Sequence, residues 1–172
     1  MKNIRNLFFI LLALMLLLGG SVYVFRPKEP ATLPEEAIAT AKFYDLKDAV
    51  QPLAQWKGKV MVLNFWGTWC PPCRAEIPEF IRFQKQYEKQ GVQFVGVAID
   101  QKSKAQAYAT ELGINYPILL GDLAGIDLAR RIGNAEGGLP YTVITDRGGK
   151  VIATQLGTLS YEKLESIVKP LL

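Results

Sequence analysis

The sequence predicts an α/β domain built on a mixed, largely parallel sheet that helices cover on both faces. Two short apolar runs, at 59–65 and 93–99, have the nearly continuous hydrophobicity of strands that are buried on both sides. A segment with helical spacing of apolar residues follows the first run, and a second helical segment follows the other. Strands that alternate with helices in this way form parallel sheets.

The individual elements follow in chain order. Apolar side chains recur at helical spacing over 74–90, and Gly91 is expected to end that helix. Ser103 is expected to cap a second helix that reaches Leu112 and stops at Gly113. Three shorter elements are predicted after it: a strand at 118–120, a helix at 123–132, and a last helix that begins at Ser160 and runs toward Val168.

A hairpin is predicted near the C-terminus. Residues 141–145 and 150–156 have strand character and flank the turn sequence Asp-Arg-Gly-Gly. This hairpin adds antiparallel strands to the sheet, which is why the expected sheet is mixed.

Composition limits the classes of function. The chain has 172 residues, 49% hydrophobic and 21% charged, which suits one packed domain with an appendage. The net charge is +4, but 16 basic and 15 acidic residues lie beyond residue 30, so no nucleic-acid partner is expected. The chain has no histidine, which excludes histidine triads and metal sites that need imidazole.

Residues 7–25 are predicted to form a transmembrane anchor. They carry no charge, and a helix of this length approaches the ~30 Å of the hydrocarbon core. Lys2 and Arg5 precede the run, so residues 1–6 are expected in the cytoplasm and the rest across the membrane. The alternative is a cleaved signal peptide. Either way the domain lies outside the cytoplasm, where disulfides persist.

Residues 26–38 are expected to form a partly extended tether, since the segment holds three prolines and is rich in charged residues. The folded domain is expected to occupy 39–172. The whole protein would then be a single-pass protein of the cell inner membrane with a periplasmic domain.

The sequence Cys-Pro-Pro-Cys at 70–73 lies between a buried strand and a helix. A cysteine at a helix N-terminus meets unsatisfied N–H groups and the positive end of the helix dipole, which stabilise a thiolate. Cys70, at the tip, is expected to be the exposed attacking thiol, and Cys73 the more buried resolving thiol. Together they form the expected redox-active disulfide.

Alternative interpretations of this pair remain open. A structural disulfide would close a ring of only four residues and constrain little of the unfolded chain. A zinc site needs more ligands than the chain offers, but Cu(I) on two thiolates is possible. Glu76 follows Cys73 by three residues and could move the proton of that thiol, or could be an ordinary acidic residue favoured by the helix dipole.

The stretch N-F-W-G-T-W-C-P-P-C-R-A-E-I-P resembles the active site of thioredoxin-fold proteins, in particular the membrane-anchored TlpA/ResA/DsbE-like branch that includes thiol reductases of cytochrome c maturation. Pro78 stands five residues after the second cysteine, as in that fold. G-G-L-P-Y-T-V-I-T-D-R-G-G-K resembles the second signature of the branch. The resemblance covers roughly residues 40–172 and implies a thioredoxin fold with an N-terminal transmembrane helix.

The resemblance also implies roles for further residues. Leu139–Pro140 would be a cis peptide that faces the cysteines and presents the Leu139 backbone to a client protein; the alternative is an ordinary trans proline at the start of a strand. Trp69, next to Cys70, and Tyr141, next to Pro140, are expected from their positions to line the same client-binding surface. Asn64 stands where cytoplasmic thioredoxins carry a buried acid, and it cannot transfer protons, so Glu76 becomes the better candidate for that task beside Cys70 and Cys73.

The function expected from these observations is a thiol–disulfide oxidoreductase, without cofactor or metal, that reduces disulfides in client proteins. The family implies apocytochrome c or copper-site cysteines as clients. Since the chain has two cysteines, a membrane thiol electron donor would have to reduce its disulfide. A monomer is expected. Alternatives are a dithiol oxidase of the same fold, a Cu(I)-binding module of the metallochaperone type, and a purely structural domain.

Overall fold

The computed structural model describes residues 33–172. Within this part of the chain, seven strands form one sheet in the order β2-β1-β5-β4-β3-β6-β7. The strands are β1 (Lys42–Asp45), β2 (Val50–Pro52), β3 (Val60–Trp66), β4 (Val92–Ala98), β5 (Ile118–Leu120), β6 (Tyr141–Thr145) and β7 (Val151–Leu156).

The centre of the sheet is formed by β3 and β4. These strands are parallel, in register from Val60 opposite Val92 to Trp66 opposite Ala98, and every residue of both is buried. On the other side of β3, β6 pairs antiparallel and continues into the antiparallel β7. The predicted mixed sheet with two continuous apolar strands at its centre is therefore confirmed. The expectation that it is largely parallel is wrong, because only β3–β4 and β4–β5 are parallel, while β1 and β2 at one edge and β6 and β7 at the other pair antiparallel.

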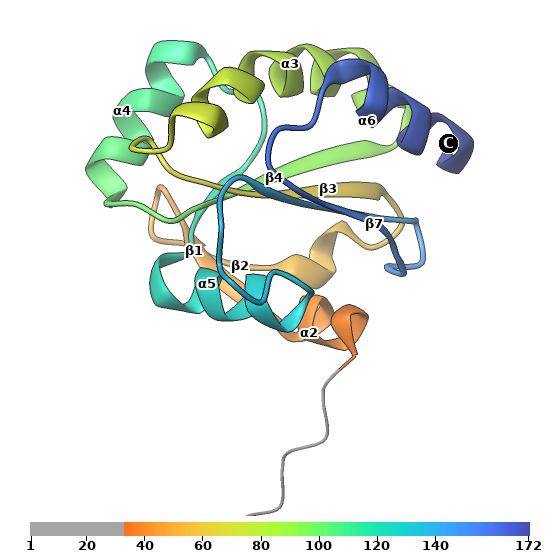
Figure 1. The fold of residues 1–172 in the computed structure, drawn as a ribbon, viewed down its shortest axis with the longest axis horizontal. Helices are drawn as coiled ribbons and strands as arrows, with labels where there is room; N and C mark the ends of the chain where they lie inside the picture. Colours follow the sequence, from red (N-terminus) through yellow and green to blue (C-terminus); the bar gives the residue numbers. More distant parts are fainter. Residues whose placement is uncertain (1–32) are drawn as a thin grey trace, which may run out of the picture. The chain divides into compact units, whose positions relative to one another are not determined.

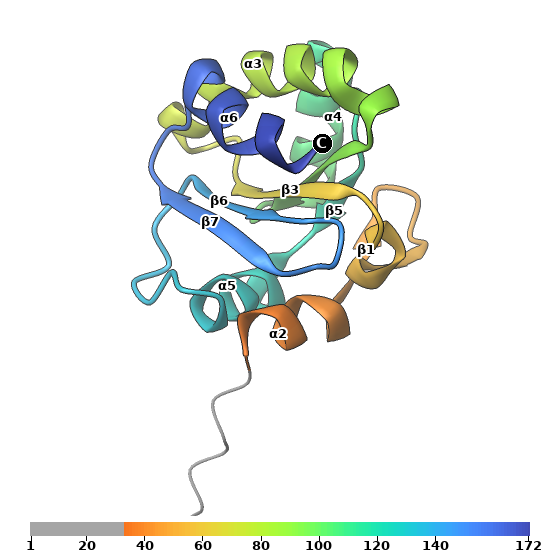
Figure 2. The same cartoon turned by 90° about the vertical axis from the view of Figure 1, so that its right-hand side faces the viewer.

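Helices cover both faces of the sheet (Figures 1 and 2). One face carries α3 (Pro71–Tyr87), α4 (Lys102–Leu112) and α6 (Tyr161–Val168), and the other carries α2 (Pro34–Thr40) and α5 (Asp122–Arg131). The described residues also form three short 3-10 helices, η1 (Leu53–Trp56), η2 (Glu88–Gln90) and η3 (Lys169–Leu171).

Two cores result, because successive side chains of a strand point to opposite faces. We call the cluster that contains Val62, Trp66 and both cysteines the α3-side core. The cluster that contains Leu63, Phe65 and residues of α2 and α5 is the α5-side core. The sheet thus separates the cysteines from the N-terminal helix α2.

Several helix ends agree with the sequence, and one does not. Gly91 and Gly113 both adopt the left-handed conformation that ends a helix, with φ of 96° and 62°. Ser160 caps α6 by accepting a hydrogen bond from the backbone N–H of Lys163. Ser103 is not a cap: α4 begins at Lys102 after an extended Gln101, so Ser103 lies inside its first turn.

The predicted tether is wrong over its last residues. Residues 34–38 belong to α2, whose Ala37 and Ile38 are buried in the α5-side core. Pro34 suits the first turn of a helix, where its missing N–H costs nothing, and Glu35 and Glu36 favour a helix N-terminus. The hairpin of β1 and β2 was also not predicted from sequence.

The expected anchor at 7–25 and the tether before residue 33 lie outside the described residues. None of the helices in residues 33–172 is both long enough and apolar enough to cross a membrane.

Candidate active site

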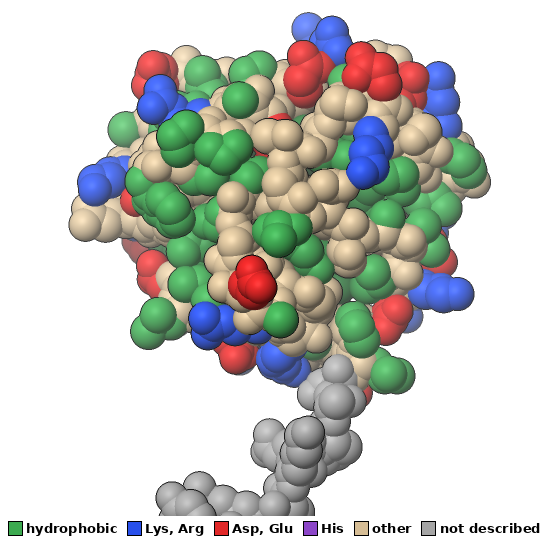
Figure 3. Space-filling view, in the orientation of Figure 1, with side chains coloured by type: hydrophobic (Ala, Val, Ile, Leu, Met, Phe, Trp, Pro, Cys, Tyr) green, Lys and Arg blue, Asp and Glu red, His purple; other side chains and the backbone are tan. Residues whose placement is uncertain are grey.

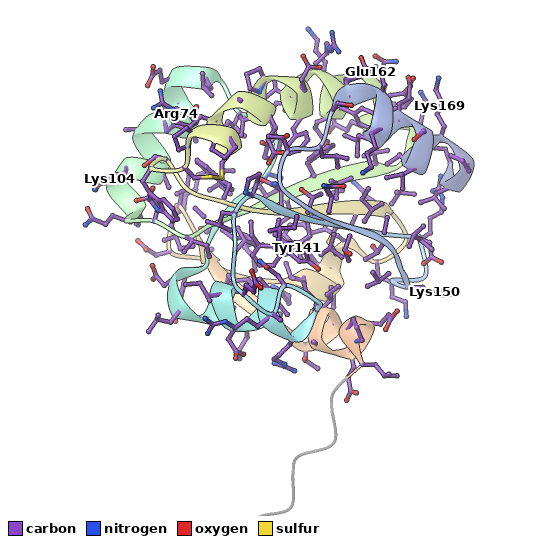
Figure 4. The ribbon with its side chains drawn as sticks, viewed as in Figure 1. Arg74, Lys104, Tyr141, Lys150, Glu162 and Lys169 are labelled. Atoms are coloured by element: carbon purple, nitrogen blue, oxygen red, sulfur yellow. A yellow bond between two sulfur atoms is a disulfide. The ribbon has the colours of Figure 1, made fainter. Side chains whose placement is uncertain are left out.

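The two cysteines lie where β3 passes into α3, as the sequence predicts. A tight turn, closed by the Cys70 N–H and the Gly67 carbonyl at 3.2 Å, connects the strand to the helix. Cys70 is the N-cap of α3, and its Sγ accepts a hydrogen bond from the Cys73 backbone N–H at 3.4 Å. Figure 4 shows the disulfide beneath the first turn of this helix. The helix N-terminus therefore favours negative charge on the Cys70 sulfur.

The cysteines form a disulfide with their Cα atoms 5.3 Å apart. Cys70 is 4% exposed and Cys73 is fully buried, at 0%. Cys70 is therefore not the exposed thiol that the sequence predicts, because the fold buries both cysteines. Cys70 is slightly less buried than Cys73, which is the order expected of an attacking and a resolving thiol.

Glu76 is buried in the α3-side core, with 3% of its surface exposed. Its Oε1 accepts a hydrogen bond from the Asn64 side-chain amide at 2.9 Å, and its Oε2 accepts one from the Leu159 backbone N–H at 3.0 Å. Burial raises the pKa of this carboxyl to about 7, although both hydrogen bonds act to lower it. The structure thus contradicts the interpretation of Glu76 as a solvated residue of a helix N-terminus.

Asn64 connects Glu76 to the strand that follows Pro140. Its amide nitrogen donates both to Glu76 and to the Thr142 hydroxyl, the latter at 3.0 Å. Asn64 Oδ1 and the indole Nε1 of Trp66 are buried without a hydrogen-bond partner among the described residues. Both residues belong to β3 and point into the α3-side core, so the surroundings of Glu76 are polar within a mostly apolar core.

Thr142 and the Leu159 backbone were missed by the sequence analysis. A signal for Thr142 was present: it stands two residues after Pro140 in a strand, and residues two apart share a face. Leu159 gave no signal, because its contribution is a backbone N–H. Tyr116 was missed as well; burial, with the charge of Glu76 as a second cause, raises the pKa of its hydroxyl.

The residues expected to bind clients are only partly brought together. The Leu139–Pro140 peptide bond is cis, and Leu139 packs against the cluster that contains both cysteines. Trp69 directly precedes Cys70 and is 62% exposed. Tyr141 differs, because its side chain is 3% exposed, lies in the α5-side core and donates a hydrogen bond to the Ile132 carbonyl (Figure 4).

No group of three or more Cys, Asp or Glu side chains within residues 33–172 is gathered so that it could hold a metal ion. On the face of the molecule drawn in Figure 3, acidic and basic side chains are interspersed. The chemistry that the described residues bring together is that of two thiols, one buried carboxyl group and the amide that binds it.

Comparisons with known proteins agree with this chemistry. The Redoxin family model matches residues 34–170. The thiol-disulfide oxidoreductase ResA of Bacillus subtilis is 32% identical over 181 residues, which span 99% of this chain and 97% of that protein. The protein of the same name from Geobacillus kaustophilus is also 32% identical, over 160 residues that span 91% of this chain and 88% of its own.

Solved structures give the same result. A thiol:disulfide interchange protein of the thioredoxin family from Chlorobium tepidum superimposes with a TM-score of 0.67 at 30% identity, covering 77% of this chain and 93% of that one. The structure of MTB dsbF in mixed oxidized and reduced forms has a TM-score of 0.69 at 25% identity, covering 82% of this chain and 100% of that one.

Proposed function

Because the chain belongs to the Redoxin family and is a thiol–disulfide oxidoreductase with a thioredoxin fold, we propose that it reduces disulfides in client proteins through Cys70 and Cys73. The observation that carries this proposal is the disulfide between two cysteines at one helix N-terminus, with Cys70 as the N-cap. A thiol pair of this kind can attack with one sulfur and resolve with the other.

The reaction is a pair of exchanges. The Cys70 thiolate attacks one sulfur of the client disulfide, whose S–S bond breaks while a Cys70–client disulfide forms and the other client sulfur leaves as a thiolate. Cys73 then loses its proton and attacks the Cys70 sulfur, which releases the second client thiolate and forms the Cys70–Cys73 disulfide. The client gains two electrons, and its thiolates take protons according to their pKa.

Glu76 is suited to accept the proton that Cys73 loses. Both residues lie on the buried side of α3, three positions apart and therefore on one helical face. A carboxyl group with a pKa of about 7 can exchange a proton near neutral pH, which an exposed glutamate does poorly. Asn64 and the Leu159 N–H orient its two oxygens for this task.

The client surface that we propose surrounds Cys70. The exposed Trp69 indole and the backbone of Leu139, held beside Pro140, would contact the client polypeptide next to its cysteine. The burial of the Tyr141 side chain leaves its main chain as the part that could contribute. We therefore place Tyr141 behind the surface rather than on it.

The cellular setting that we propose follows from the sequence of residues 1–38. An uncharged run at 7–25 behind Lys2 and Arg5 supports a single-pass inner-membrane protein with a periplasmic domain. A chain with two cysteines needs an outside reductant, so we propose a membrane thiol electron donor as a partner. Apocytochrome c and copper-site cysteines are the proposed clients, and the proposed state is a monomer.

The midpoint potential of the Cys70–Cys73 couple tests the direction of the reaction. The full chain, equilibrated with glutathione or dithiothreitol, should have a potential below about −220 mV, toward the thioredoxin end of the range. A value near about −120 mV would identify a disulfide donor instead. Cys70→Ser should abolish reduction of a peptide disulfide; stoichiometric copper on the reduced chain with no turnover would favour the Cu(I)-binding alternative.

A further inference from the structure

The turn that carries Cys70 is attached to the two residues that follow β4. Ile99 donates its backbone N–H to the Trp66 carbonyl at 2.7 Å, where β3 ends. The Ile99 carbonyl in turn accepts a hydrogen bond from the indole Nε1 of Trp69 at 2.9 Å. Ile99 is thus hydrogen-bonded both to Trp66, where the turn starts, and to Trp69, the residue before Cys70.

Asp100 holds the remaining central residue of the turn. One carboxylate oxygen, Oδ2, accepts hydrogen bonds from the Thr68 backbone N–H at 2.8 Å and from the Thr68 hydroxyl at 2.5 Å. The other oxygen accepts the Gln101 N–H at 2.8 Å. Partial burial alone would raise the pKa of Asp100, but these hydrogen bonds outweigh it and lower the pKa, so the carboxylate is ionised at neutral pH.

The Trp69 ring depends on the same attachment. Most of its surface is exposed, yet the ring lies so close over Gly67 that a Cβ atom there would be 2.7 Å from its Nε1. An exposed side chain has little packing to fix its rotamer. The hydrogen bond to Ile99 and the fixed turn beneath it therefore determine where the indole points.

We propose that Asp100 is a positioning residue, which fixes the Thr68–Trp69 turn so that the Cys70 sulfur and the Trp69 indole are presented to the client disulfide in one arrangement. This inference rests on the proposed function. It deepens that function by adding a residue from the loop after the neighbouring strand β4 to the site. No hydrogen bond joins Asp100 to either cysteine, so Asp100 acts on them through Thr68.

Because Asp100 lies outside both cores, its role in positioning the turn can be tested separately from any contribution to core packing. Its side chain is only partly buried and fills no position in either core, so its truncation leaves no apolar cavity. A small displacement of a reacting group, in contrast, can slow a reaction by up to about a hundredfold. Removal of Asp100 should therefore lower the rate of reaction more clearly than it lowers stability.

The test uses the reduced full chain and three variants, Asp100→Ala, Asp100→Asn and Asp146→Ala. Asp146 is the matched control, because its carboxylate also accepts a hydrogen bond from a backbone N–H, that of Lys150. It lies at the β6–β7 turn, beside the start of β3, whereas the cysteines follow the end of that strand. Two rates are measured across pH: alkylation of Cys70 by iodoacetamide, and reduction of a short peptide disulfide.

Asp100→Ala should slow both reactions by about tenfold. Asp100→Asn should stay close to the original rates, since its amide oxygen can still accept both hydrogen bonds from Thr68 and only the bond from the neighbouring Gln101 N–H is lost. Asp146→Ala should change neither rate. The proposal is overturned if Asp100→Ala keeps both rates, or if Asp100→Asn loses as much as Asp100→Ala, which would make the charge rather than the position decisive.

Two further outcomes are distinguishable. If Asp100→Ala does not fold, Thr68→Val removes one of the two bonds to Oδ2 and should give an intermediate loss in both rates; unchanged rates would overturn the proposal. If the original chain alkylates normally but does not reduce the peptide, the proposed function fails, while the alkylation rates still decide the role of Asp100.

Discussion

The two faces of β3 show how one strand can serve two purposes. On the side of α5, Met61, Leu63 and Phe65 are buried among apolar residues. On the side of α3, the same strand carries Asn64, which binds Glu76, the only buried carboxylate among residues 33–172. Burial of a polar group costs free energy unless it is hydrogen-bonded. Within β3 this cost falls on the face that contains the cysteines, where Asn64 lies, while the α5-facing residues of the strand are all apolar.

Truncation of Leu63 should give the largest effect on stability. Leu63 is fully buried in the α5-side core, so Leu63→Ala removes apolar contacts and leaves a cavity, which costs about 2–5 kcal/mol of unfolding free energy. Urea denaturation measures this loss. The midpoint potential of the folded variant should stay unchanged, and a clear shift would show that the two faces are not independent.

Glu76→Gln should sharpen the comparison between the two faces of β3, because it should change how the free energy of unfolding depends on pH. The folded state raises the pKa of Glu76 from 4.5 to about 7, so the folded chain keeps a proton that the unfolded chain has lost. The stability supplied by this proton is complete below pH 4.5 and disappears as the pH rises through about 7. The loss is about 3 kcal/mol, at 1.36 kcal/mol for each pKa unit.

The measurement is urea denaturation of the oxidised chain at pH 5 and pH 8, in which the cysteines do not titrate. Glu76→Gln cannot ionise, so its stability should fall less between these pH values than that of the original chain. Since Gln offers one acceptor oxygen for two donors, an overall loss at pH 5 is expected as well. Equal pH dependence of both proteins would contradict the assigned pKa.

Thr142→Val should have the smallest effect. The substitution removes one of the two hydrogen bonds of the Asn64 amide and keeps the shape of the side chain, which costs about 1 kcal/mol. Asn64 can still donate to Glu76, so the pH dependence should persist. If it vanished, Thr142 would be holding Asn64 in place, and the polar group would be a coupled network rather than a pair.

Much of the fold could be predicted from the sequence, because its strongest signals are local. The runs at 59–65 and 93–99 are continuous and apolar, and glycines at 91 and 113 mark helix ends through their backbone freedom. The hairpin of β1 and β2 could not be predicted, since Phe43 is the one buried residue of these two strands and the sequence shows no alternation of apolar and polar residues there. Helix α2 was not predicted, because the prolines at its start and before it are also typical of an extended tether.

The site shows the same division between local and long-range information. Cys70 and Cys73 were evident from spacing, and Glu76 from its place on their helix. The contacts that bury and bind Glu76 come from residues 12 and 83 positions away, so no local pattern reports them. Tyr141 was assigned to the client surface by its position after Pro140, but the alternation of β6 turns it to the opposite face.

The absence of histidine gives the buried carboxyl group an experimental use. A chain without imidazole has no histidine titration to overlap with that of Glu76 near neutral pH, so a carboxyl band that changes in this pH range in infrared difference spectra can be assigned to Glu76. Its neutral C=O stretch is separate from the amide bands, and an Asp or Glu that is ionised at the same pH does not contribute there. The protein therefore contains its own vibrational reporter of proton movement, which could be followed in time after rapid reduction of the disulfide.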